Sequence, residues 1–378
     1  AGDTIVVGAH CDDDEGSCSG SAYVFRTTDG GATYGQVAKL TASDAASDYF
    51  GSSVAIDGDT VVIGATIGAR DNNGDRGAVY VFRTTDSGAT YGQVAKLTAS
   101  DAATGDSFGH SVAITGDTVV VGTYLKEAVY VFLSTDGGAT YAQVAKLTAS
   151  DAASGDNFGR SVAIDGGTVV VGASHYDNGG LGAVYVFLTT DGGATYGQVA
   201  KLTANDGATD ESFGNSVAID GDIFLIGAYW PDDGFGSDSG SAYVFALNPP
   251  FTAAPTHLPT RHTISWPQIA KMSASDAAAS DEFGSSVAID GDTVVVGSPL
   301  DDDVPNYSGS AYVFHTSDGG ATYVEVAKLT ASDAASYDYF GYSVAIDGST
   351  VVVGAYYENG YRGAVYVFRT TDGGATYD

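Results

Sequence analysis

Short apolar runs, separated by segments rich in Gly and Asp, recur along the chain. Between residues 50 and 97 the runs cover 50–56, 60–65, 78–82 and 93–97, and they are dominated by β-branched and aromatic residues. Runs of this length and composition predict β-strands, and no 3.6-residue periodicity indicates a helix. We name the four predicted strands of this unit A, B, C and D.

The unit repeats along the whole sequence. Strand B recurs seven times, at Ile5, Val61, Val119, Val169, Phe224, Val294 and Val351. Strand C follows each time, at Tyr23, Tyr80, Tyr130, Tyr185, Tyr243, Tyr312 and Tyr366. A unit of about 50 residues with four strands is typical of one propeller blade. The sequence therefore predicts an all-β fold, a seven-bladed β-propeller of four-stranded antiparallel blades.

We expect one propeller domain over residues 1–378. The blades are predicted at about 1–40, 41–97, 98–147, 148–202, 203–272, 273–329 and 330–378. The sequence opens within an A-B turn and closes after a C-D turn, so strands A and D are each predicted six times. We expect the chain to be a fragment of a longer protein.

Six Phe-Gly pairs begin the predicted A strands, and each precedes a run such as Val-Val-Val-Gly-Ala. The pairs are Phe50-Gly51, Phe108-Gly109, Phe158-Gly159, Phe213-Gly214, Phe283-Gly284 and Phe340-Gly341. This pattern resembles the FG-GAP repeat of integrin α-subunit propellers. The resemblance implies Ca²⁺-binding A-B loops, but turns such as Asp57-Gly58-Asp59 have too few ligands for a Ca²⁺ cage.

The C-D turns carry a second motif, shown by residues 27–34, Thr-Thr-Asp-Gly-Gly-Ala-Thr-Tyr. It resembles the Asp box of sialidases and other propellers, which implies a folding element on the face opposite an active site. The motif recurs around Asp86, Asp136, Asp191, Asp318 and Asp372. Asp and Thr side chains satisfy backbone groups in tight turns, so we interpret all six turns as structural.

The chain is strongly acidic, with a formal net charge of -32. Such a charge repels nucleic acids and anionic membrane surfaces, and no apolar stretch approaches the length of a membrane-spanning helix. Cys11 and Cys18 are predicted to form a local disulfide, which would indicate an oxidising, extracellular compartment; free thiols are the alternative. Asn306 begins the one N-x-S/T sequon and is the predicted glycosylation site.

The B-C loops vary in length and content, whereas the A-B and C-D turns on the other face are repetitive. Variable loops on a rigid scaffold commonly carry function. Acidic and aromatic residues of these loops are the candidate ligand-binding set: Tyr176, Tyr229, Trp230, Asp232, Asp233, Tyr356 and Tyr357. Asp71, Asn73 and Asp75 have the spacing that begins a Ca²⁺ loop, but the downstream bidentate Glu is absent, so loop solvation is the favoured interpretation. No cofactor is required, and Ca²⁺ is the cation that such loops would bind.

Two other features depart from simple repetition. The D-A loops carry an acid pair in every blade, such as Asp101 and Asp106, which we expect to tie each loop to backbone amides. Residues 246–268 replace one C-D turn with a Pro-rich insertion. In this insertion Arg261, His262 and Trp266 are candidate residues for docking a partner, and a decorative insertion is the alternative.

Catalysis has little support in the sequence. A sialidase-like site needs an arginine triad, but Arg26, Arg83 and Arg369 adjoin the C-D turns on the opposite face. We therefore predict a non-catalytic extracellular or cell-surface module, adhesive or structural, that binds protein or glycan through its B-C loops, within a surface or filament assembly. A carbohydrate-binding lectin is the first alternative, and a glycoside hydrolase or lyase is the second.

Overall fold

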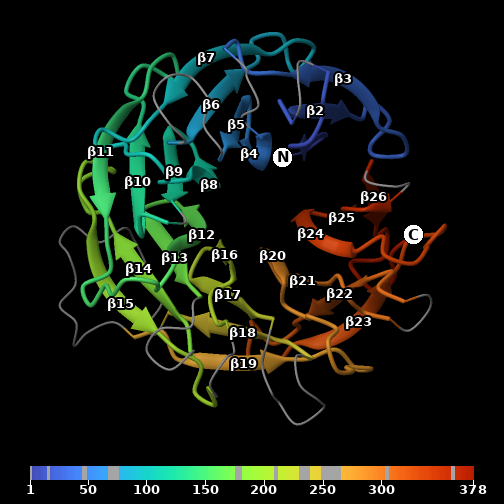
Figure 1. Ribbon diagram of the computed structural model, residues 1–378. Helices are drawn as coiled ribbons and strands as arrows, with labels where there is room; N and C mark the ends of the chain where they lie inside the picture. Colours follow the sequence, from blue (N-terminus) through green and yellow to red (C-terminus); the bar gives the residue numbers. More distant parts are fainter. Residues whose placement is uncertain are drawn as a thin grey trace. The chain divides into compact units, whose positions relative to one another are not determined.

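The computed structural model describes residues 2–14, 18–44, 49–66, 76–123, 125–174, 181–207, 212–229, 239–247, 265–302, 306–358 and 362–378. In these ranges 26 strands form seven antiparallel sheets, each built from consecutive strands (Figure 1). Five sheets have four strands, whereas the first and the last have three. The predicted all-β, seven-bladed propeller is confirmed, with strands A and D each found six times. No helix in these ranges is long and apolar enough to cross a membrane.

The chain divides into two compact units, and the division passes through blade 4. The first unit contains blades 1 to 3. Blade 1 consists of β1 (Thr4–Ala9), β2 (Ser21–Arg26) and β3 (Gly35–Leu40). Blade 2 consists of β4 (Phe50–Asp57), β5 (Thr60–Ala65), β6 (Ala78–Arg83) and β7 (Gly92–Leu97). Blade 3 consists of β8 (Phe108–Thr115), β9 (Thr118–Thr123), β10 (Ala128–Leu133) and β11 (Ala142–Leu147).

Blade 4 consists of β12 (Phe158–Asp165), β13 (Thr168–Ala173), β14 (Ala183–Leu188) and β15 (Gly197–Leu202). The second unit contains the remaining blades. Blade 5 consists of β16 (Ser216–Asp220), β17 (Ile223–Ala228), β18 (Ser241–Ala246) and β19 (Gln268–Met272). Blade 6 consists of β20 (Ser286–Asp290), β21 (Thr293–Ser298), β22 (Ser310–His315) and β23 (Val324–Leu329). Blade 7 consists of β24 (Phe340–Asp347), β25 (Thr350–Ala355) and β26 (Ala364–Arg369).

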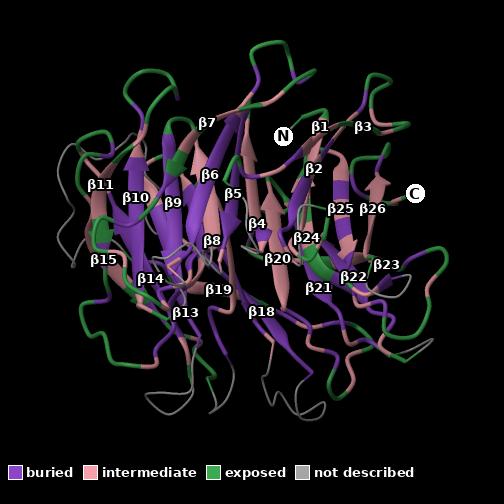
Figure 2. Cartoon of the chain, turned by 45° about the horizontal axis from the view of Figure 1, so that its top comes forward, coloured by how far each residue is buried: buried purple, intermediate pink, exposed green. Residues whose placement is uncertain are grey.

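The Phe of each Phe-Gly pair is a core residue. Phe50 is completely buried, and its ring meets the rings of Tyr80 and Phe82 at centroid distances of 5.4 and 6.0 Å. Edge-on aromatic contacts of this kind add to the stabilisation that burial itself provides. Strands B and C of the complete blades are accordingly the most buried strands, as the purple colour of β5 and β6 in Figure 2 shows.

Glycines bring successive blades into backbone contact. A Cβ atom added to Gly64 of β5 would lie 2.1 Å from the carbonyl oxygen of Gly109, the glycine of the next Phe-Gly pair. Gly109 itself has a φ of +91°, a conformation that only glycine adopts without strain. Ser53 Oγ adds a hydrogen bond to the same Gly109 oxygen at 2.7 Å. The Phe-Gly and Val-Gly-Ala motifs therefore form one contact between neighbouring blades.

The C-D turns are held by the acids predicted to stabilise them. Asp318 accepts hydrogen bonds from the Thr322 amide at 2.9 Å and the Thr322 hydroxyl at 2.7 Å, and Thr316 Oγ1 donates to Asp318 Oδ1 at 2.9 Å. These bonds lower the pKa of Asp318 to about 2. The same set of bonds forms around Asp29, Asp86, Asp191 and Asp372, and the Ser134 hydroxyl takes the place of the first Thr at Asp136.

Candidate functional site

Many of the predicted site residues lie outside the described residues. They are Tyr176, Trp230, Asp232 and Asp233 of the ligand set, Asp71, Asn73 and Asp75 of the metal set, and Arg261 and His262 of the docking set. Tyr229, Tyr356 and Tyr357 are described. Tyr229 is half-buried directly after β17. Tyr356 and Tyr357 follow β25 and belong to a larger aromatic cluster.

Six tyrosines of blades 6 and 7 form a continuous series of ring contacts, which we call the tyrosine row. In order, the row is Tyr307, Tyr337, Tyr339, Tyr357, Tyr356 and Tyr342. The successive ring centroids are 5.6, 6.5, 5.2, 4.7 and 4.9 Å apart. These distances fall in or near the range of favourable aromatic pairs. Tyr342 and Tyr356 are stacked, with an interplanar angle of 20°.

Three segments of the chain build the row, and backbone hydrogen bonds join them. The loop between β23 and β24 supplies Tyr337 and Tyr339, whose amides donate to the carbonyl oxygens of Asn306 at 3.0 Å and of Tyr307 at 3.3 Å. The Tyr357 amide donates to the Asp338 carbonyl oxygen at 3.2 Å. The B-C loops of blades 6 and 7 are thus fixed against the intervening D-A loop, and the rings are held in place before any ligand arrives.

The row includes backbone strain that blades 3 and 4 avoid, although Ser280 of blade 6 has a similar φ of 71° at the same position. Tyr337 has a φ of 72°, in the left-handed region that is unfavourable for a bulky side chain. Blades 3 and 4 place Gly105 and Gly155 at this position, with φ values of 86° and 94°. A tyrosine is therefore kept where glycine would fold more easily.

Half of the row is open to solvent. The side chains of Tyr337, Tyr342 and Tyr356 are 52%, 56% and 36% exposed. No other Tyr, Phe or Trp in the described part of the chain is as exposed. Tyr339 lies deeper, and burial together with the neighbouring Tyr357 and Tyr337 raises its pKa. An exposed aromatic surface rimmed by polar groups is a common mark of an interaction site.

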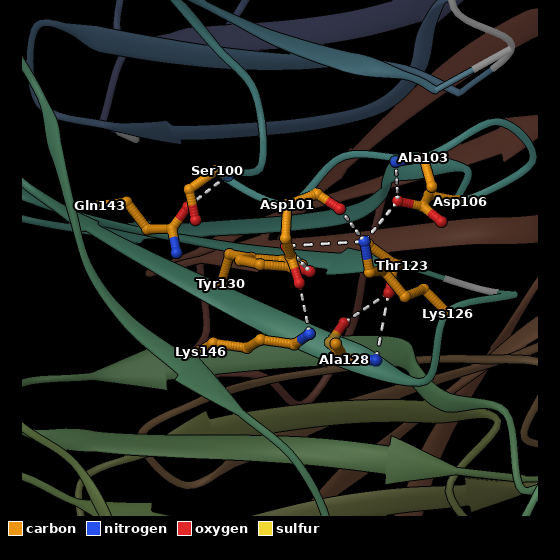
Figure 3. Close-up of polar contacts among 10 residues, drawn as sticks. All are labelled: Ser100, Asp101, Ala103, Asp106, Thr123, Lys126, Ala128, Tyr130, Gln143 and Lys146. Carbon is orange, nitrogen blue, oxygen red and sulfur yellow. Dashed lines mark hydrogen bonds and ion pairs between the residues drawn. The ribbon is translucent and has the colours of Figure 1, made fainter. Parts of the chain in front are cut away.

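The acid pairs of the D-A loops are structural, but their two members act differently. Ala103 N donates to Asp106 Oδ2 at 2.6 Å, so the second acid binds a backbone amide as predicted. The first acid instead meets side chains of its blade: Tyr130 Oη donates to Asp101 Oδ1 at 2.6 Å, and Lys146 Nζ lies 2.7 Å from Asp101 Oδ2 (Figure 3). The Lys146 ammonium also lies 5.6 Å from the centroid of the Tyr130 ring. We call this Tyr-Lys-Asp group a rung.

Rungs recur in blades 2 and 6. The rung of blade 2 consists of Tyr80, Lys96 and Asp44. The Tyr80 hydroxyl donates to Asp44 Oδ1 at 2.9 Å, and Lys96 Nζ lies 2.6 Å from Asp44 Oδ2. In blade 6 the rung contains a second acid, because Asp301 from the B-C loop joins Asp276, Tyr312 and Lys328. In each of these blades the lysine comes from strand D. Sequence reasoning recognised the acids but not their tyrosine and lysine partners.

Trp266 is not available to dock a partner. It is only 6% exposed and stacks on Phe224 at a centroid distance of 5.8 Å. Trp266 lies two residues before Gln268, as Tyr34 lies two residues before Gln36, so it replaces the aromatic residue of the missing C-D turn. The predicted docking role of Trp266 is therefore wrong, because the insertion returns to the repeat register at this residue.

Cys11 and Cys18 are free thiols in this structure, so the predicted disulfide is not formed here. Their Sγ atoms are 3.3 Å apart, whereas a disulfide requires about 2.05 Å. Burial and the contact with Cys18 raise the pKa of Cys11 to about 11. Asn306, the predicted glycosylation site, is exposed at one end of the tyrosine row.

Within the ranges that the structure describes, no group of three or more His, Cys, Asp or Glu side chains is placed to hold a metal ion. The arginines considered for a sialidase-like triad have other partners. Arg26 Nη1 donates to the Ser87 carbonyl oxygen, and Arg83 Nη1 donates to that of Gly137. Arg26 and Arg83 therefore each bind the C-D turn of the next blade, whereas Arg369 Nη2 donates to Ser349 Oγ of its own blade at 3.3 Å.

Sequence reasoning missed four members of the row, Tyr307, Tyr337, Tyr339 and Tyr342. The signal was present: residues 336–342 read Ser-Tyr-Asp-Tyr-Phe-Gly-Tyr, whereas the matching segment of blade 3 reads Thr-Gly-Asp-Ser-Phe-Gly-His. The D-A loops were interpreted through their regular acids, so the irregular tyrosines between those acids were passed over.

Comparisons with known proteins agree with this architecture. No curated protein sequence matches the chain. Among solved structures, a Bacteroides uniformis protein provisionally described as a 6-phosphogluconolactonase is similar, with a TM-score of 0.60, 12% identity and coverage of 99% of this chain and 94% of that one. At this identity the likeness concerns the fold alone. The FG-GAP repeat model matches residues 1–25, 34–82, 91–142, 141–187, 196–245, 266–314 and 323–368, and the chain therefore belongs to the FG-GAP repeat family.

Proposed function

We propose that the chain is a non-catalytic recognition module of an extracellular or cell-surface protein, adhesive or structural in role, that binds a protein or glycan. The single observation that carries this proposal is the tyrosine row. Six rings are in contact, three of them are exposed, and backbone hydrogen bonds hold the segments that bear them.

Tyrosine suits recognition because each ring offers a broad apolar face and a hydroxyl group that can donate or accept. Tyrosines are also enriched among the residues that dominate binding energy at interfaces. The rings of the row already contact one another, so binding costs little additional side-chain ordering. A ligand with flat apolar faces and exposed hydroxyl or amide groups would match this surface.

The net charge of -32 further limits the chemical class of the partner. A strongly acidic chain repels nucleic acids and anionic lipid surfaces, and it attracts neutral or cationic ligands. A glycan without acidic groups or a basic protein surface therefore fits better than a polyanion. Ca²⁺ could bridge the acidic loops to an anionic partner, but the proposal does not require it.

A lectin is the second candidate, and the stacked pair Tyr342 and Tyr356 favours it. The two rings are nearly parallel, 4.9 Å apart at their centroids, and 56% and 36% exposed. The exposed surface of such a pair can pack against the apolar face of a sugar ring.

A glycoside hydrolase or lyase is less well supported, because the acids and arginines described above already have structural partners. In blade 6, Asp276 and Asp301 both accept a hydrogen bond from Tyr312 and form ion pairs with Lys328. A general acid and a base for glycoside hydrolysis need carboxyl groups that face the substrate. The bonds of these two acids stabilise their blade instead.

An array that carries glycans and extracellular-matrix proteins tests the proposal. The double variant Tyr342→Ala/Tyr356→Ala should lose about tenfold or more in affinity for any ligand that the unmodified chain binds. Tyr342→Phe keeps the ring and should retain most of the binding. Val324→Ala, at a residue that is 63% exposed on β23, is the control and should bind normally. Unchanged binding by the double variant would show that the tyrosine row does not bind the ligand.

A further inference from the structure

The end of the tyrosine row between blades 6 and 7 presents aromatic rings that are inclined to one another rather than stacked. Tyr337 is 52% exposed, and its ring is inclined by 44° to that of Tyr307 and by 60° to that of Tyr339, at centroid distances of 5.6 and 6.5 Å. The rings of Tyr339 and Tyr357 are inclined by 68°. Inclined rings turn their faces in different directions, so one compact group beside Tyr337 can contact more than one ring.

The segments that build the row carry negative charge only. Residues 306–308, 336–343 and 355–358 contain Asp338 and Glu358, and they contain no Lys, Arg or His. Glu282, from the D-A loop before β20, is also near: burial, the neighbouring rings and the Glu282 carboxylate together raise the pKa of Tyr339. The electron-rich ring faces and the surrounding carboxylates therefore attract positive charge.

The blades themselves show how this chain binds a positive group. In the rung of blade 2, Lys96 Nζ lies 5.2 Å from the centroid of the Tyr80 ring and 2.6 Å from Asp44 Oδ2. In each of blades 1 to 6 the ammonium of a strand D lysine lies 5.2–5.6 Å from the centroid of a tyrosine ring. These distances are within the range of cation-π contacts. Tyrosine rings close to carboxylates are thus a cation-binding arrangement that this protein already uses.

The row differs from a rung in its hydrogen-bond acceptors. Asp338 Oδ2 already accepts a hydrogen bond from the Ala335 amide at 2.6 Å, and Glu358 Oε2 accepts one from the Tyr366 hydroxyl at 2.6 Å. Both acids are more than nine-tenths buried. A primary ammonium has three donors that need acceptors when they lose water. A quaternary ammonium has no N–H donor, so ring faces and nearby negative charge are sufficient to bind it.

We propose that Tyr337, together with Tyr307 and Tyr339, binds a trimethylammonium group, with the methyl groups against the rings and the charge balanced by the surrounding carboxylates. This inference rests on the recognition role proposed above, because it assigns a ligand class to the tyrosine row. Aromatic rings are a known means of recognising alkylated ammonium groups. Trimethylated lysine and choline esters both carry this group. The net charge of -32 favours a protein with trimethylated lysine, since the phosphate of phosphocholine is repelled.

A ligand-observed NMR titration with choline and with its uncharged carbon isostere, 3,3-dimethylbutanol, tests the role of the charge. The two molecules have nearly the same shape and apolar area, so hydrophobic contact alone would bind them equally. Choline should bind about tenfold more tightly, because only choline gains the attraction to the ring faces and carboxylates. Equal affinities, or no saturable binding of choline, would overturn the proposal.

Substitutions at Tyr337 locate the site. Tyr337→Gly introduces the residue that blades 3 and 4 have at this position, so the loop should fold normally while the ring is lost. This variant should bind choline about tenfold more weakly, and no more tightly than the isostere. Tyr337→Phe keeps the ring and should bind choline normally. Leu125→Ala, at a residue that is 61% exposed in the B-C loop of blade 3, is the control. Undiminished choline binding by Tyr337→Gly would show that the site lies elsewhere.

Three further ligands identify the source of the cation. N-acetyl-trimethyllysine methylamide should bind more tightly than its unmethylated counterpart and more tightly than phosphocholine. Equal binding of the two lysine derivatives, or tighter binding of phosphocholine, would contradict the assignment to a methylated protein. The array separates this inference from the recognition role itself. If the array yields a ligand that the double variant no longer binds, but choline does not bind, the recognition role stands and the trimethylammonium site is wrong.

Discussion

Blades 6 and 7 differ in one strand, and the comparison shows what that strand does. Both contain a buried Phe-Gly phenylalanine, a Tyr bonded to two acids, and a C-D turn held by an Asp with a pKa of about 2. Blade 6 adds β23, and Tyr312 is then completely buried, whereas Tyr366 of blade 7 is only partly buried. The outer strand therefore completes both the burial and the charge balance of its blade.

The largest difference between the blades is expected when their rung tyrosines are truncated. Tyr312→Ala should cost about 3–5 kcal/mol, the range for a large buried aromatic side chain. Tyr366→Ala should cost less than half as much, because its ring already contacts solvent. Urea denaturation followed by fluorescence measures both. Equal losses would contradict the inference that β23 accounts for the greater burial of blade 6.

At the tyrosines of the C-D turns we expect a smaller difference of opposite sign, because here the substitution in blade 7 should cost more stability than the one in blade 6. Tyr377 Oη is hydrogen-bonded to Thr293, but the buried Tyr323 hydroxyl has no partner among the described residues, since Ile223 occupies the position of that threonine. Tyr377→Phe should therefore cost about 1 kcal/mol. Tyr323→Phe should be neutral or slightly stabilising. The variant Ile223→Thr supplies a hydrogen-bonding partner, and in that background Tyr323→Phe should become destabilising; if it does not, the missing threonine is not the cause.

The smallest difference is expected in acid. Hydrogen bonds in the C-D turns lower the pKa of both Asp318 and Asp372 to about 2, against about 3.9 in an unfolded chain. A lowered pKa in the folded state contributes stability that is complete above about pH 4 and is lost as the pH falls towards 2. The urea midpoint of the unmodified chain should fall between pH 5 and pH 2. Asp318→Asn and Asp372→Asn should each reduce this fall, and by equal amounts. A clear inequality would show that the missing strand also weakens the turn of blade 7.

The fold was predictable because the same pattern of strands and turns recurs in every repeat. Runs such as Thr60–Ala65 and Ala78–Arg83 are β-branched and aromatic, and Asp-Gly turns separate them, so strand positions could be assigned to within about one residue. In blades 5 and 6 strand A begins at Ser216 and Ser286, three residues after the Phe, because the ladder is interrupted beside the Phe-Gly pair. Phe213 and Phe283 form only isolated bridges there.

The site was less predictable because its contacts join residues distant in sequence. Tyr356 and Tyr357 were recognised as loop aromatics, but their contact with Tyr339 and Tyr342 depends on how two loops pack. Trp266 was interpreted as a docking residue of a Pro-rich insertion, and only the strand register shows that it takes the position of the half-buried tyrosine of a C-D turn. Periodicity identifies elements, whereas such contacts depend on three-dimensional packing.

The contact between Gly64 and Gly109 has a consequence for how such a protein can change. At 2.1 Å for an added Cβ, the two backbones have no room for any side chain, so the spacing between neighbouring blades is set by main-chain atoms. Loop sequences can then diverge freely without altering that spacing. A duplicated blade would also fit its neighbours at once, provided that it carried both glycines. The Phe-Gly motif of the FG-GAP family thus fixes the spacing between neighbouring blades, which allows such a protein to gain whole repeats.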